Sequence, residues 1–157
     1  MSGPAGVEPP EHARFARHIR TLAEVSAEEE GELVAAVLRD PDASMARSAI
    51  VRHFDERAPG LLTQGGFPAW ATRMRQAVAG DGFLAERLRE WTLVHAVVQG
   101  EPWSAEELAT ASDWCQRTVA ASETPAPPEA LAILAAWGRT RRVRTEAGRR
   151  LRGEGWR

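Results

Sequence analysis

Two amphipathic helical patterns joined by Asp40-Pro41-Asp42 constrain the fold of this chain more than any other feature. Proline disfavours helical backbone at the residue before it, so Pro41 ends the first pattern at Asp40. Asp42 can then accept a backbone N–H at the start of the second. Residues 28–57 therefore predict two helices joined by a tight turn. The apolar stripes of the two helices are Leu33, Val34, Val37 and Leu38, then Met45, Ala49, Ile50 and Phe54.

The rest of the chain repeats this helical pattern. Ser26 with Glu29 and Ser104 with Glu107 match the capping box, in which a hydroxyl and a carboxylate satisfy the free N–H groups of a helix start. We expect Pro59-Gly60 to end the second helix of the pair, and a single helix to run from Ser104 through residue 119. No segment alternates apolar and polar residues as a strand would. The prediction is an all-α fold, a compact multi-helix domain of about seven helices built from αα-hairpins.

Length and composition suggest one domain with two unusual ends. The chain has 157 residues, and its one cysteine excludes an internal disulfide. We expect a disordered N-terminal tail at residues 1–8, a single all-α domain at 9–137, and an arginine-rich C-terminal helix or tail at 138–157. Neither a secretory signal nor a membrane-spanning stretch is recognisable, which predicts a cytoplasmic protein. All 20 basic residues are arginine, and lysine, asparagine and tyrosine are absent, which we interpret as the product of a G/C-rich, bacterial genome.

Charge separates the C-terminal segment from the rest. Residues 138–157 carry eight arginines and two glutamates, a net charge of +6, whereas residues 1–137 carry twelve arginines and twenty acidic residues, a net charge of −8. If the segment is helical, Val143, Ala147 and Leu151 form its apolar stripe. A basic surface of this kind can bind an acidic partner, nucleic acid phosphates or anionic lipid, or it can fold back on the acidic body or simply be solvated. The arginines that would form it are Arg141, Arg142, Arg144, Arg149 and Arg150.

A second candidate site surrounds His95, a polar residue in an otherwise apolar helical stripe. With Trp91, Trp114 and Cys115 it could line an interior pocket, where the imidazole would act as a ligand or general base. The alternative is a hydrogen-bonded core histidine. We find no catalytic constellation, metal-ligand spacing or phosphate-binding glycine pattern, so we expect no metal and no cofactor.

Residues 32–57 resemble one unit of a HEAT-type helical repeat. Asp40 and Pro41 match the turn of that repeat, Met45 stands where a valine is usual, and Ala49 fits the small interior position. The family's usual arginine is replaced by Ala46. The resemblance implies a helical binding surface without chemistry of its own.

The leading hypothesis from the sequence is therefore a non-enzymatic interaction or adaptor protein. It would bind another macromolecule, a protein in the first instance, through a helical face or the arginine-rich C-terminus. One alternative is a small helical enzyme or ligand carrier with an interior pocket near His95. The other is nucleic-acid binding by the basic C-terminus.

Overall fold

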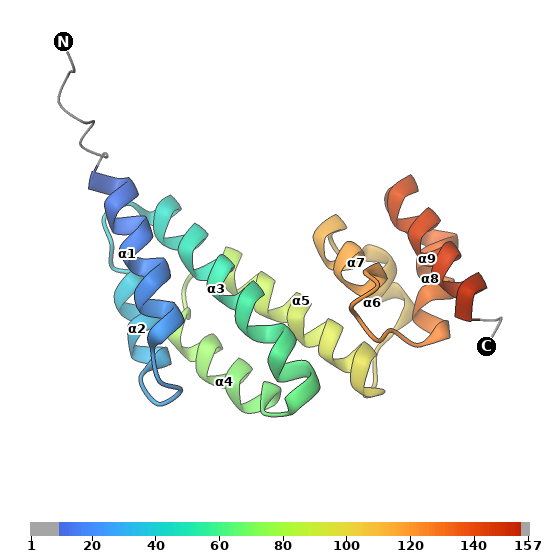
Figure 1. Ribbon diagram of the computed structural model, residues 1–157, viewed down its shortest axis with the longest axis horizontal. Coiled ribbons are helices and arrows are strands. Elements are labelled where there is room, and N and C mark those ends of the chain that lie inside the picture. Colours follow the sequence, from blue (N-terminus) through green and yellow to red (C-terminus); the bar gives the residue numbers. More distant parts are fainter. Residues whose placement is uncertain (1–9, 155–157) are drawn as a thin grey trace, which may run out of the picture. The chain divides into compact units, whose positions relative to one another are not determined.

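The computed structural model describes residues 10–154, and within this range the chain forms nine helices and no strand (Figure 1). The predicted all-α fold is confirmed, with more helices than the expected seven. The expected disorder of residues 1–8 lies outside the described residues. The helices are α1 (Pro10–Glu24), α2 (Glu30–Val37), α3 (Ala43–Gln64), α4 (Phe67–Ala77), α5 (Gly82–Gln99), α6 (Ala105–Thr110), α7 (Asp113–Ala120), α8 (Pro128–Trp137) and α9 (Arg141–Glu154).

The described chain divides into two compact units, and the division falls inside α5, between Leu88 and Arg89. The charge pattern suggested a division at 137/138 instead, and α9 in fact packs with α7 and α8 in the second unit. A domain is a part that can fold alone, which packing does not test. A single domain at 9–137 with a separate segment at 138–157 therefore stays a prediction.

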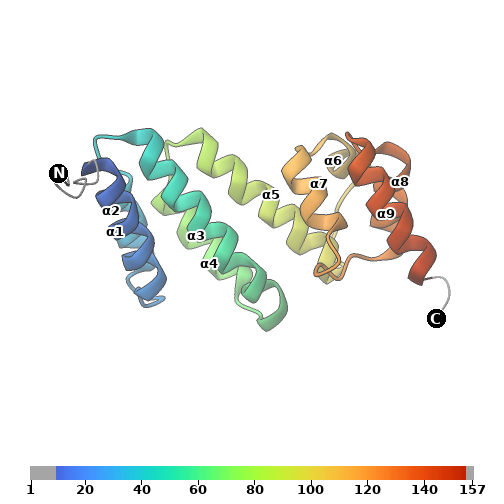
Figure 2. The same ribbon diagram turned by 45° about the horizontal axis from the view of Figure 1, so that its top comes forward.

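The first unit contains two helical hairpins, α1/α2 and α3/α4, followed by the beginning of α5. Helix α1 packs on α3, and α2 packs on α4, as the two views show (Figure 2). The ring of Phe54 meets the ring of Trp70 edge-on, with 5.6 Å between centroids. The largest side chains buried in this unit are Trp70, Phe54, Phe67, Ile50, Met74, Leu84 and Leu88.

The second unit repeats this arrangement with shorter helices. Helix α6 packs on α8, α7 packs on α9, and α8 and α9 lie against each other along their length. The aliphatic side chains of its core include Leu108, Val119, Leu131, Leu134 and Val143. In both units, then, each helix of one hairpin lies on the corresponding helix of the next hairpin.

Several helix ends follow the sequence signals. Asp42 caps α3, because its Oδ1 accepts the backbone N–H of Met45 at 3.0 Å. Ser104 and Glu107 form the predicted capping box at the start of α6. The expected end at Pro59-Gly60 is wrong, since α3 continues to Gln64. Pro59 has no N–H to donate to the carbonyl one turn earlier in the helix. Because Pro59 is exposed, water can reach that carbonyl instead.

The expected single helix from Ser104 to residue 119 is also wrong, because Ser112 starts a new helix. The Oγ of Ser112 accepts the N–H of Cys115 at 3.1 Å and caps α7. Glu90 in turn accepts both the N–H and the hydroxyl of Ser112, at 3.0 and 2.8 Å. This second cap and its anchor on α5 separate α6 from α7.

Candidate functional site

Helix α9 is attached to the second unit by the apolar stripe that the sequence predicts. Val143 and Ala147 are fully buried, and Leu151 is half-buried. The opposite side of α9 faces solvent. The five arginines expected to form a basic surface are therefore all on an ordered helix, but they do not all have the same role.

Two of the five bind backbone carbonyls of their own unit. Arg150 lies at the end of α7, where its Nη1 donates to the carbonyl of Ala121 at 2.8 Å and its Nη2 donates to that of Thr124 at 2.9 Å. Carbonyls at a helix C-terminus lack partners within the helix and carry partial negative charge, so a guanidinium stabilises them. Arg144 binds the carbonyl of Gly138 in the α8–α9 connection at 2.8 Å.

A third arginine is paired within α9. The guanidinium of Arg149 contacts Glu146 through two hydrogen bonds, of 2.5 and 3.2 Å. The hydrogen bond from Arg149 lowers the pKa of the Glu146 carboxyl below its usual value. The charge of Arg149 is therefore largely offset by its neighbour.

Exposed arginines without such a partner remain on the outer side of α9. Arg141 and Arg152 form no hydrogen bond or ion pair with another residue in the range 10–154, and neither does Arg142. At 100° per residue, positions 141 and 152 lie on one face of the helix, separated by about 16 Å along its axis. Thr145 lies between them on that face. We call this face, Arg141, Thr145 and Arg152, the arginine stripe.

Trp137, the last residue of α8, is 72% exposed. Leu131, Leu134 and Trp137 share one helical spacing, which predicts that the ring of Trp137 joins the two leucines in the core. That expectation is wrong at the helix end, where the chain turns at Gly138 and α9 covers Leu134 but leaves Trp137 uncovered. The exposed ring lies four residues before Arg141 in the chain.

A buried polar residue that helical periodicity does not reveal holds the α8–α9 connection in place. Gln116 is fully buried, and its Nε2 donates to the carbonyls of Leu108 and Ala109 at 2.9 and 3.1 Å. Its Oε1 accepts the backbone N–H of Arg139 at 2.8 Å. The side chain of Arg139 donates to the carbonyl of Ala111 at 2.6 Å. The start of α9 is thus fixed to the end of α6.

The residues of the second candidate site pack closely in the second unit. The rings of Trp91 and Trp114 meet edge-on at 5.1 Å. Cys115 is buried, with its Sγ 3.9 Å from the carbonyl of Glu90. His95 is also buried, and its Nδ1 lies 3.7 Å from Oε2 of Glu101. The functional pocket that we suggested for these residues stays a prediction.

The first unit contains a buried carboxylate that the sequence did not reveal. Glu30 is 1% exposed, although it is the first residue of α2. Its Oε2 accepts the indole N–H of Trp70 at 2.9 Å and lies 2.7 Å from Nε2 of His53. Arg57 approaches the same oxygen at 3.4 Å. The cluster joins α2, α3 and α4.

Among the described residues, no group of three or more histidine, cysteine, aspartate or glutamate side chains is arranged to hold a metal ion. In the same range no helix combines the length and apolar character needed to cross a bilayer. Comparison of the chain with known protein families, curated proteins and solved structures finds no match.

Proposed function

We propose that the protein is a non-enzymatic adaptor that binds an acidic segment of another protein through the arginine stripe of α9. The observation that carries the proposal is the exposure of Arg141 and Arg152 on one face, without an ion pair to any residue in the range 10–154. Guanidinium groups bind carboxylates through two parallel hydrogen bonds, so a stripe of this length suits an extended or helical acidic segment.

Trp137 supports a protein partner. Tryptophan and arginine are the residue types that contribute most to the binding energy of protein interfaces. Trp137 belongs to α8, which packs against α9, and it is the most exposed large apolar side chain of the described chain. Its burial on binding would add an apolar contribution to the charge pairing.

The packing of the helices supports a HEAT-like interpretation of the scaffold. In each unit, consecutive hairpins stack with first helix on first helix and second on second. Helical repeat proteins stack in this way and use the resulting surfaces for binding. Residues 32–57 span α2 and α3, and so belong to two consecutive hairpins of the first unit.

A protein partner suits the charges better than nucleic acid does. Nucleic-acid binding depends on neutralising several phosphates and is typical of basic domains. The net charge of this chain is −2, and three of the five expected arginines are used within the second unit.

The test is a comparison of three forms of the full-length chain. They are the wild type, the stripe variant Arg141→Glu/Arg152→Glu, and the control Arg73→Glu/Arg75→Glu, whose arginines are exposed on α4 and whose charge change is identical. Quantitative affinity purification identifies proteins that the wild type and the control bind. Affinity for a purified partner should then fall at least about tenfold in the stripe variant alone.

Two outcomes contradict the proposal. One is equal affinity of the stripe variant and the control for every partner. The other is preferential binding of a labelled DNA or RNA duplex, with affinity that falls steeply as salt increases, because this would assign the stripe to nucleic acid.

A further inference from the structure

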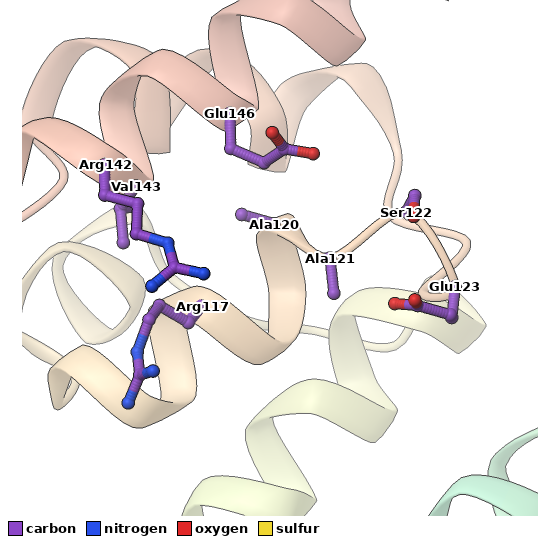
Figure 3. A pocket seen from close by; sticks show the side chains of 8 residues that line it. All are labelled: Arg117, Ala120, Ala121, Ser122, Glu123, Arg142, Val143 and Glu146. Atoms are coloured by element: carbon purple, nitrogen blue, oxygen red, sulfur yellow. The ribbon is translucent and has the colours of Figure 1, made fainter.

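A charged hollow lies between the end of α7 and the first half of α9 (Figure 3). Its volume is about 350 Å³, which is near the lower limit for small-molecule sites. The small apolar side chains of Ala120, Ala121 and Val143 line part of its wall, and Ser122 contributes a hydroxyl. All of these residues belong to the second unit, so the hollow is complete within one compact unit.

Two of the charged groups around the hollow are already paired. The Nε of Arg117 lies 2.9 Å from Oδ2 of Asp113, one turn earlier on α7. Figure 3 shows the guanidinium of Arg117 turned away from the centre of the hollow. Glu146, on the α9 side, is held by Arg149. These pairs shape the rim but leave little unbalanced charge.

Two further charges at the hollow are not paired. Arg142 and Glu123 form no hydrogen bond or ion pair with another described residue, although the charge of Arg142 also acts on Glu146 and helps to lower the pKa of that carboxyl. Figure 3 shows the guanidinium of Arg142 reaching from α9 toward α7, while the carboxylate of Glu123 lies on another side, beyond Ala121. The hollow therefore presents one available cation and one available anion, separated by small apolar side chains.

We propose that this hollow binds a small zwitterion of amino-acid size. Its carboxylate would bind the guanidinium of Arg142, and its ammonium group would bind the carboxylate of Glu123. The carbon chain between them would lie against Ala120, Ala121 and Val143. A plain anion would be repelled by Glu123, and a plain cation by Arg142, whereas a zwitterion satisfies both charges. This site needs no macromolecular partner and goes beyond the adaptor function proposed above.

The experiment titrates the ¹⁵N-labelled full-length protein with a series of ω-amino acids, followed by amide chemical shifts. The probes are glycine, 4-aminobutyrate and 6-aminohexanoate, which differ in the separation of their charges. Pentanoate and pentylamine are the matched probes with one charge each. We expect one of the ω-amino acids to shift the amides of residues 120–123 and 142–146, and to bind at least about threefold more tightly than either singly charged probe.

Four single variants complete the test. Arg142→Gln and Glu123→Gln should each weaken binding of that ω-amino acid by at least about threefold. Arg152→Gln and Glu129→Gln neutralise exposed charges away from the hollow and should leave its affinity unchanged.

The proposal is overturned by the absence of shifts with every ω-amino acid, by equally tight binding of pentanoate or pentylamine, or by equal affinity in all four variants. The adaptor function is tested separately. The variant Arg141→Glu/Arg152→Glu should lose the protein partner and keep the zwitterion, so either proposal can fail alone.

Discussion

The Nε2 of His53 lies 2.7 Å from Oε2 of Glu30, inside the first unit. Burial raises the pKa of Glu30, but the hydrogen bonds from His53 and Trp70, with the charges of His53 and Arg57, outweigh it and hold the pKa below its usual value. Glu30 is therefore a buried carboxylate. Its other oxygen, Oε1, has no hydrogen-bond partner among the described residues. The stability of the unit therefore depends on the partners of Oε2.

Replacing His53 should destabilise the protein strongly. His53→Ala removes the nearest partner of a buried charge, which typically costs about 3–5 kcal/mol. Urea unfolding followed by far-UV circular dichroism measures the change. The control is His12→Ala, since His12 is exposed on α1 and its loss should cost less than about 0.5 kcal/mol. Equal effects of the two substitutions would contradict a stabilising role for the cluster.

Acid should weaken the attachment of α1 to the α2–α3 turn. The backbone N–H of Asp42 donates to Asp40 at 2.9 Å, and His18 and Arg14 each approach the carboxylate at 3.1 Å. The first of these contacts contributes most, and together they lower the pKa of Asp40 from 3.8 to about 2. At a pH between these two pKa values, Asp40 is protonated in the unfolded chain but ionised in the folded chain. The contribution of Asp40 to the free energy of unfolding therefore decreases as the pH falls through this range.

The pH effect can be assigned to Asp40 by substitution. Asp40→Asn should be less stable than the wild type at neutral pH, and the difference should shrink as the pH falls from about 4 to about 2. Urea midpoints across that range measure it. The variant Glu56→Gln removes an exposed ion pair on α3 and should show a much smaller dependence on pH. A difference for Asp40→Asn that stays constant with pH would contradict the assignment.

Gln116→Ala should destabilise the second unit. The substitution leaves the N–H of Arg139 and the carbonyl of Ala109, both partly buried, without this partner, whereas the carbonyl of Leu108 keeps the N–H of Ala111. Unpaired buried groups cost about 1–3 kcal/mol each, so a loss of at least about 2 kcal/mol is expected. Gln76→Ala is the control, since Gln76 is exposed on α4. Similar unfolding midpoints for both variants would show that the network contributes little.

Two glycines should respond to alanine in opposite ways. A Cβ at Gly138 would lie 2.7 Å from the carbonyl oxygen of Leu134 and 2.8 Å from Cγ1 of Val143, although the φ of −55° suits any residue. Backbone cannot move aside easily, so Gly138→Ala should destabilise the protein by about 1–3 kcal/mol. Gly31, inside α2, has no atom within 4 Å of such a Cβ, and Gly31→Ala should stabilise the helix by about 0.5–1 kcal/mol. Thermal unfolding of the two variants should shift in opposite directions.

Local signals in the sequence were enough to predict the helical fold and several helix ends. The caps at Asp42 and Ser104 involve residues three positions apart, so their chemistry is visible in the sequence. The break at Ser112 was missed because it depends on Glu90, which lies 22 positions earlier. Pro59 was misjudged because a proline on the exposed side of a helix can be tolerated.

The roles of the polar residues could not be predicted in the same way. A glutamate at a helix start is normally solvated, and only the folded arrangement of α3 and α4 brings His53 and Trp70 to Glu30. Likewise, the arginines of α9 look equivalent in sequence. Arg150 differs from Arg141 only because the end of α7 lies beside it. Such distinctions arise from contacts between distant segments, and periodicity carries no information about them.

The hydrogen bonds from Arg150 to the last turn of α7 determine which truncated forms of this protein can be used in experiments. A chain that ends before α9 would lose Arg150. The buried residues Val119 and Ala120 would become exposed, and their carbonyls would lose the hydrogen bonds from Arg150. A shortened chain that failed to bind would report a damaged scaffold. Charge reversals at single exposed positions keep the hydrogen bonds between Arg150 and the end of α7. For the same reason, fusion tags should be placed at the N-terminus.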